Sequence, residues 1–309
     1  MQEDGALDEP RRRIALLSAL AGFAMFALGD GVTKSTAGLW PGGAVGALRF
    51  SLGAAVLCLI LLLREGVGGF RIPRPMIQIG RGVAMGMATA CFFTAIQWIP
   101  LATVIAIGFT TPLWTAVISA TVLREHVPLR IWTTIGLALI GVLLVLRPSF
   151  GAIGFAALLP LAGAMAMATL MILNRQVADC TPGLLSQVLV AAFAVPVLVA
   201  LAVALHLTGD PAFHIGAPGW PVIWRAAVVG FGATIGHWLI YHATVHATAA
   251  TIAPASYVQL PIAITVGWVV FGDIPDWLDI AGIALIVIAG MRLMTAPASG
   301  RHAAEQHQH

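Results

Sequence analysis

The sequence has very little charge and almost no lysine. Only 9% of its 309 residues are charged, and Lys34 is the one lysine. A soluble domain keeps about a quarter of its residues charged, because its surface must face water. Here 59% of the residues are hydrophobic and the mean hydropathy is +0.94. The chain lacks the charge to cover a soluble globule, so we expect much of its surface to face lipid.

Several kinds of site are also missing from the sequence. The cysteines, Cys58, Cys91 and Cys180, have neither disulfide nor metal spacing, so we expect no disulfide framework and no metal. The sequence holds no Gly-x-x-x-x-Gly-Lys-Ser/Thr loop, which argues against a nucleotide-driven pump and a nucleotide cofactor. The net charge of +3 does not indicate a nucleic-acid partner, because most arginines sit singly between apolar runs.

Apolar runs dominate what is present. A membrane span needs roughly 17–25 mostly apolar residues. The run that follows Arg11-Arg12-Arg13 continues to about residue 33, too long for a signal peptide, so we interpret it as a retained first helix. The sequence thus predicts an all-α integral membrane protein with ten transmembrane helices, at about 14–33, 43–63, 78–98, 103–123, 129–146, 152–174, 184–205, 222–243, 248–271 and 277–294.

The basic residues predict the orientation of these helices. With the N-terminus in the cytoplasm, twelve arginines fall on inside segments, whereas only Lys34, Arg147 and Arg225 fall outside. Such an excess of positive charge is typical of cytoplasmic loops. We therefore expect a multi-pass protein of the inner membrane, with cytoplasmic tails at 1–13 and 296–309, the second of them disordered.

An internal repeat divides the chain. Residues 101–146 and 247–294 share an Ala-Thr opening, a proline inside the first helix, an acid at its end, a second proline and a Gly-x-Ala-Leu-Ile run. A unit of five helices is odd, so its second copy enters the membrane upside down. We predict two inverted five-helix repeats, 14–148 and 149–295, around a central cavity, a design that recurs in secondary transporters.

Specific motifs within this repeat resemble a known family. The segment Phe93–Pro148 has an aromatic start, Pro-Leu-Ala, a mid-helix proline, a helix-end acid and a glycine-rich fifth helix. Asp30-Gly-Val-Thr-Lys34 and Arg49-Phe50 are similar to patterns in the first and second helices of one branch. The chain resembles the drug/metabolite transporter superfamily, specifically its EamA-type ten-helix carriers. The resemblance implies inward-facing and outward-facing states around a central cavity.

Three ionisable residues near the outer side are candidates for gating or coupling. An ionisable group inside a membrane span costs about 2.5–3.5 kcal/mol, so it is a functional candidate by default. Asp30 and Lys34 share one helical face, where they can form an interfacial anchor or a gate. Alternatively, Arg49 pairs with Asp30 and leaves Lys34 for an anionic group. We favour a structural or gating pair for Arg49, with substrate binding second.

Two further acids, Glu125 and Asp273, end the repeated helices beside prolines. Arg124 replaces the family's usual glycine, and Asp273 replaces the more common glutamate. We interpret both acids as capping and packing residues at the membrane surface, because the repeat marks them as architectural.

Prolines inside the fourth and ninth spans indicate irregular backbone. Pro112 and Pro261 each remove one backbone hydrogen bond, and such backbone is tolerated where it lines a cavity. The segment 237–246 is the most polar stretch of the second half, and a histidine there can sense or carry a proton. Its His242/His246 pair lacks a third ligand for a metal. The predicted cavity residues are Gln97, Thr110, Trp114, His237, Tyr241, Tyr257 and Gln259.

These features favour one function over another. The first hypothesis is a secondary transporter that moves a small polar or amphipathic metabolite, such as an amino acid or nucleoside, by alternating access. A proton is the coupling ion that the polar residues suggest. The alternative is an intramembrane enzyme acting on a lipid-linked substrate. That alternative needs a catalytic cluster at one depth, and the sequence predicts no catalytic residues of this kind.

Overall fold

The computed structural model describes residues 4–121, 129–246 and 252–294, and this part of the chain is helical with no strand. Its long helices are α1 Asp4–Lys34, α2 Gly42–Glu65, α3 Pro75–Trp98, α4 Leu101–Gly108, α5 Thr111–Thr121, α6 Leu129–Ile153, α7 Leu159–Val177, α8 Gly183–His206, α9 Trp220–His246, α11 Gln259–Phe271 and α12 Trp277–Met294. Short 3-10 segments precede α7 (η2, Gly154–Leu158) and α11 (η4, Ala253–Val258).

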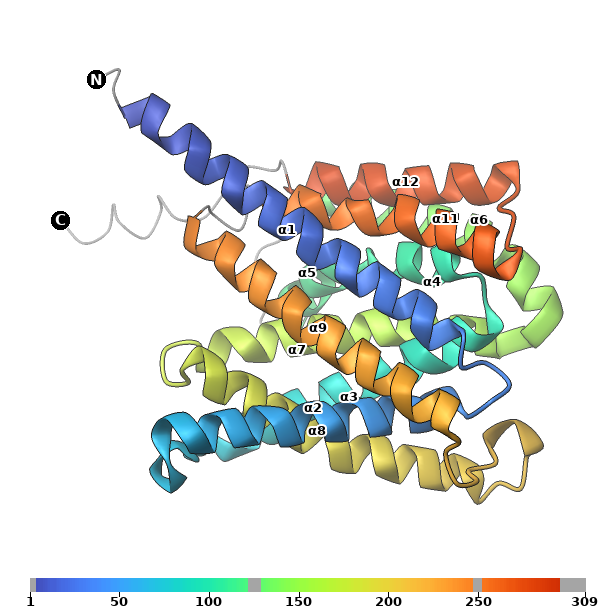
Figure 1. The fold of residues 1–309 in the computed structure, drawn as a ribbon. Helices are drawn as coiled ribbons and strands as arrows, with labels where there is room; N and C mark the ends of the chain where they lie inside the picture. Colours follow the sequence, from blue (N-terminus) through green and yellow to red (C-terminus); the bar gives the residue numbers. More distant parts are fainter. Residues whose placement is uncertain (1–3, 122–128, 247–251, 295–309) are drawn as a thin grey trace.

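Each predicted span coincides with one of these helical segments, and α4 with α5 forms the fourth. In the described ranges, six segments are long and apolar enough to cross a bilayer, the first being Arg13–Lys34. Two shorter apolar segments, Trp132–Arg147 and Ala255–Phe271, match the fifth and ninth spans. The all-helical membrane fold expected from the sequence is confirmed. The start of α1 and the end of α12 lie on the same side of the bundle (Figure 1), as an even number of crossings requires.

The helices form two groups joined by a diagonal pair. In Figure 1, α6, α11 and α12 lie along one side and α2, α3 and α8 along the other, while α1 and α9 run side by side across the front. Buried side chains of α4, α6, α11 and α12 make the largest apolar core, centred on Ile107, Val142 and Ile286. The α4–α5 junction and α7 lie between the two groups.

Small residues allow close approach where α6 meets α12. A methyl group added to Gly141 would lie 2.7 Å from the carbonyl oxygen of Gly282, and one added to Gly282 would lie 2.7 Å from that of Gly141. Both distances are shorter than any real Cβ contact. Glycine at both positions therefore lets the two backbones touch, which is how helices associate tightly in membranes.

The fourth and ninth spans are interrupted near Pro112 and Pro261, whereas α8 remains one helix through Pro196. α4 ends at Gly108 and α5 begins at Thr111, so Pro112 occupies the first turn of a new helix, where its missing N–H costs nothing. The hydroxyls of Thr110 and Thr111 donate to the carbonyls of Ile107 and Gly108 at 2.6 and 2.7 Å. In the ninth span, the 3-10 segment η4 leads into α11, with Pro261 in its first turn.

Candidate functional site

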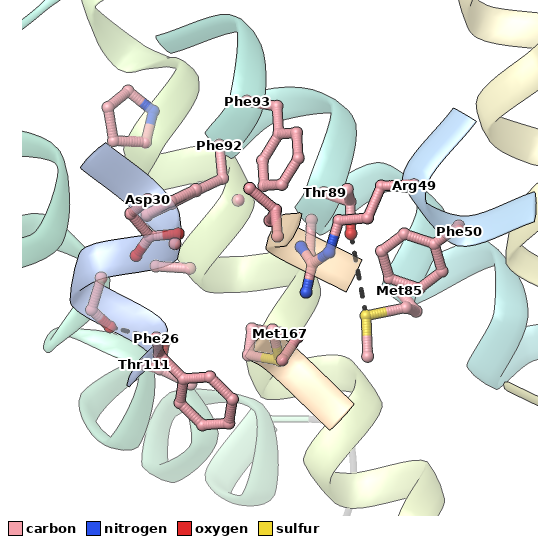
Figure 2. Close-up of a pocket in the computed structure, with 18 of the residues that line it drawn as sticks. Phe26, Asp30, Arg49, Phe50, Met85, Thr89, Phe92, Phe93, Thr111 and Met167 are labelled. Atoms are coloured by element: carbon pink, nitrogen blue, oxygen red, sulfur yellow. Dashed lines mark hydrogen bonds between the residues drawn. The ribbon is translucent and has the colours of Figure 1, made fainter. Parts of the chain in front are cut away.

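A cavity of about 340 Å³ lies between helices of both halves of the chain. Its walls come from α1, α2, α3, α7 and α9, and the interrupted α4–α5 junction closes one side through Gly108 and Thr111. Figure 2 shows this region, with Asp30 and Arg49 reaching it from different helices. A volume of this size suits a small molecule.

Asp30 and Arg49 are the charged groups of this cavity. Asp30 lies one turn before the end of α1, and the positive charge of Arg49 is near enough to attract it. The Arg49 guanidinium lies over the rings of Phe50 and Phe93, 5.4 and 5.3 Å from their centroids. Within the described ranges, neither charged side chain makes a hydrogen bond or an ion pair. Both are therefore available to a solute.

Apolar side chains make up most of the remaining wall. Phe26 and Phe92 contribute rings, and Met85 and Met167 contribute flexible thioethers. Thr89 adds a hydroxyl, which donates to the sulfur of Met85 at 3.8 Å. Methionine and phenylalanine adapt to varied apolar shapes, so this wall suits an amphipathic solute.

His237 is the predicted cavity residue from α9 that lines this space. Its ring lies 4.8 Å from that of Phe26, centroid to centroid, and its Nδ1 is 2.7 Å from the carbonyl oxygen of Ala233. That carbonyl accepts only from an N–H, so Nδ1 carries hydrogen in this arrangement. The Nε2 side of the ring is left for other contacts.

Lys34 does not line the cavity and instead forms contacts at the end of α1. Its Nζ lies 2.5 Å from Asp273 Oδ2 and 3.0 Å from the carbonyl oxygen of Ile99, and its side chain is buried. Lys34 therefore joins the end of α1 to the end of α11 and to the α3–α4 turn. Its acidic partner is Asp273 and not Asp30. Glu125, the corresponding acid of the first repeat, lies outside the described residues.

The other predicted cavity residues lie away from this space. Gln97 donates to the Thr36 hydroxyl and the Trp40 carbonyl, at 3.2 and 3.0 Å, and so ties α3 to the loop after α1. Thr110 is buried, and its hydroxyl donates to the Ile107 carbonyl near the end of α4. On α9, Tyr241 is 67% exposed on the outer surface of the bundle.

The last three predicted residues also do not line the cavity. Tyr257 and Gln259 belong to the second interrupted span, and Trp114 belongs to α5. The Tyr257 ring contacts Phe109 at 4.9 Å, and the Gln259 side chain donates to the Ser256 carbonyl at 3.2 Å. The Trp114 Nε1 is buried, and no described residue accepts a hydrogen bond from it. The first interrupted helix thus contributes to the cavity, whereas the second contributes to the core.

Sequence reasoning missed the walls given by α3 and α7. Phe92, Phe93, Gly163 and Met167 line the cavity, yet each sits in a mainly apolar run with no charged neighbour to mark it. The aromatic pair on α3 was the signal that was available. No group of three metal-ligating residues occurs in the described ranges, so the geometry offers no basis for assigning a metal.

A second buried arginine belongs to a different region. Arg81 of α3 donates to Asn174 Oδ1 of α7 at 2.7 Å, to Ser186 Oγ of α8 at 2.6 Å, and to Gln78 Oε1. Gln78 in turn donates to Thr181 Oγ1 at 3.1 Å. Neutral oxygens from three helices therefore satisfy this charge, and the network connects α3, α7 and α8.

A helical membrane bundle with a small amphipathic cavity at its centre defines a transporter of small molecules. Residues 13–147 match the EamA-like transporter family. The resemblance to EamA-type carriers of the drug/metabolite transporter superfamily is thereby confirmed over these residues.

Curated relatives agree with this assignment. The pseudopaline exporter of Pseudomonas aeruginosa is 26% identical over 90% of this chain and 94% of its own length. A riboflavin transporter of Brucella anthropi is 26% identical, with coverage of 78% and 84%. An S-adenosylmethionine uptake transporter of Rickettsia prowazekii is 22% identical, with coverage of 78% and 79%. All three move small metabolites, which favours a metabolite transporter over an intramembrane enzyme.

A solved crystal structure shares the fold. It superposes with a TM-score of 0.57 at 21% identity, covering 92% of this chain and 98% of the other. Nearly the whole chain therefore shares the fold of that structure.

Proposed function

We propose that this protein is a secondary transporter that carries a small polar or amphipathic metabolite across the cytoplasmic membrane by alternating access. The observation that carries the proposal is the central cavity, because helices from both halves build it and it holds two charges that form no hydrogen bond or ion pair within the described residues. Amino acids and nucleosides are the kinds of solute that fit its size and its mixture of charge and rings.

The contacts between helices support two equivalent halves. Exchanging α1, α2, α3, α4–α5 and α6 with α7, α8, α9, α11 and α12 turns several of the main contacts into contacts that also exist. The α1–α9 contact becomes α7–α3, and α1–α11 becomes α7–α5. The α2–α8, α4–α11 and α6–α12 contacts become themselves. Related halves can exchange conformations across a central site, which is the basis of alternating access.

The Lys34–Asp273 contact supports a gate at one end of the cavity. It joins α1 of the first half to α11 of the second, and Ile99 of the α3–α4 turn completes it. With both termini in the cytoplasm, this end faces the outside. Release of this contact would let the two halves separate there, while the cavity stays in place between them.

Transport by purified protein in liposomes tests the proposal. A thermal-shift screen of metabolites identifies solutes that stabilise the detergent-purified protein, and counterflow then measures their exchange in vesicles. We expect labelled solute to accumulate against unlabelled solute inside. Exchange equal to that of protein-free vesicles would contradict the proposal, and chemically altered solute would favour an enzyme. Reporter fusions to either terminus test the cytoplasmic orientation.

Proton coupling extends the proposal. Asp30 is the carboxylate of the cavity, with Arg49 and His237 as its titratable or charged neighbours. A proton that binds there changes the charge of the cavity together with the substrate. We expect an imposed pH gradient to drive uptake or efflux in vesicles, and transport that ignores the gradient would remove protons from the mechanism.

A further inference from the structure

The two charges in the cavity have opposite sign. Asp30 supplies a carboxylate from α1 and Arg49 supplies a guanidinium from α2, and among the described residues no other lysine, arginine, aspartate or glutamate lines this space. The charged lining therefore sums to zero when both groups are ionised. A solute with a single charge would match one group and leave the other without a partner, which is unfavourable away from bulk water.

Within the described residues neither side chain makes a hydrogen bond or an ion pair, although the two charges are near enough to attract one another. Arg81 donates to three oxygens and Lys34 to two, whereas Arg49 touches only the faces of Phe50 and Phe93. The aromatic rings orient the guanidinium but accept none of its N–H groups. Asp30 likewise keeps all of its acceptor positions in the described structure. Two groups of this kind, facing one small space, form a two-point recognition site.

The surface between the charges is apolar. Phe26, Phe92 and Met167 line it, and Figure 2 shows the two phenylalanines Phe92 and Phe93 beside the charged pair. A solute that fills this space therefore needs an apolar portion in addition to its charged groups. The volume of about 340 Å³ limits that portion to one ring system or one branched chain.

The geometry points to a zwitterionic substrate of amino-acid type, whose carboxylate binds Arg49 and whose ammonium group binds Asp30. Its apolar side chain packs against the phenylalanine and methionine wall. Guanidinium matches a carboxylate through paired N–H donors, and a carboxylate accepts from an ammonium group. This inference rests on the proposed function, because it takes the cavity to be the transport site.

A set of matched probes tests the inference by binding. L-Phenylalanine and L-methionine carry both charges, L-phenylalaninamide lacks the carboxylate, and N-acetyl-L-phenylalanine lacks the ammonium group. We expect the zwitterions to bind purified protein roughly 10- to 150-fold more tightly than either derivative, since each lost contact involves a charged group. Calorimetry in detergent measures these affinities, and equal affinity across the set would overturn the inference.

Two variants provide a crossed test. Arg49→Gln should weaken the zwitterions and N-acetyl-L-phenylalanine, while L-phenylalaninamide keeps its affinity through Asp30. Asp30→Asn should do the reverse. Arg64→Gln, at the exposed end of α2, and the exposed neighbour Glu65→Gln are matched controls that remove the same charges outside the cavity. They should leave every affinity unchanged.

A purely structural pair predicts a different pattern. Asp30 and Arg49 would then stabilise the fold by mutual attraction, so each single variant would lower the melting temperature. The double variant would restore the melting temperature, and the preference among the probes would not change. That pattern overturns the inference, as does binding of none of the zwitterions. Counterflow of some other solute in the same vesicles would leave the transport function standing. Absence of all exchange would refute the proposed function itself.

Discussion

Arg49 and Arg81 both lie within membrane helices of this protein, and their surroundings are opposite. Arg81 of α3 is 2% exposed, and oxygens from α3, α7 and α8 satisfy its guanidinium. Arg49 of α2 lies at the central cavity with aromatic rings and no hydrogen-bond acceptor from the described chain. From the sequence, Arg49 lies within a span, where a charge is costly, whereas Arg81 counts among the basic residues of the cytoplasmic side.

The difference separates a structural charge from a binding charge. A buried charge contributes to the fold when surrounding groups satisfy it, and its removal then leaves several polar atoms without partners. A charge without protein partners contributes little to the fold. In the proposed recognition site, a solute supplies the partner of such a charge. The number of protein oxygens around each guanidinium therefore predicts which variant loses stability and which loses binding.

The largest effect on stability should come from Arg81. Arg81→Met leaves oxygens of Gln78, Asn174 and Ser186 without their donor, and we expect a loss of about 2–4 kcal/mol. Arg49→Met should change stability by less than about 1 kcal/mol, because it removes no protein hydrogen bond. Thermal denaturation in detergent compares the two. Equal losses would mean that the two arginines do not differ in role.

Gly82, next to Arg81, tests whether the same interface also depends on close packing. A methyl group at Gly82 would overlap Phe193 of α8, with that residue's carbonyl carbon at 2.7 Å. We expect Gly82→Ala to cost about 1–3 kcal/mol through overpacking. Gly53→Ala on α2 is the matched control, because its added methyl meets nothing within 4 Å. If both variants melt alike, the Arg81 network and not the helix packing holds α3 against α8.

The sequence predicted the helices better than it predicted their partners. The lengths of the apolar runs predicted the spans, and Pro112 and Pro261 indicated where two of them are interrupted, because both features depend on local sequence. Lys34 and Asp273 are 239 residues apart, so their ion pair follows only from the way α1 and α11 pack. Membrane helices are apolar on all sides, so no periodic pattern shows which face meets the cavity. For that reason the sequence could not distinguish Asp30, Arg49 and His237, which line the cavity, from Tyr241, which does not.

Lys34 represents an intermediate case, in which an acid partners the buried cation. Lys34 is 8% exposed, and Asp273 shares the contact with the Ile99 carbonyl. A double-mutant cycle with Lys34→Met and Asp273→Asn should give a coupling energy of about 1–3 kcal/mol. The double variant should also exchange solute at a changed rate in counterflow, since the proposed outer gate is lost. A coupling energy near zero would show that the contact closes nothing.

The smallest effect should come from Arg74, a cation at the surface. It donates to both carboxylate oxygens of Asp179, at 3.3 and 3.1 Å, and to the Gln176 carbonyl, and both charged side chains are exposed. Water competes for every one of these contacts, so Arg74→Gln should cost less than about 1 kcal/mol, and less still at high salt. Melting temperatures at two salt concentrations measure this. Arg74 and Arg81 have similar numbers of oxygen partners and differ chiefly in their exposure to water. A loss of stability as large as that of Arg81→Met would therefore mean that burial does not set the contribution of these arginines.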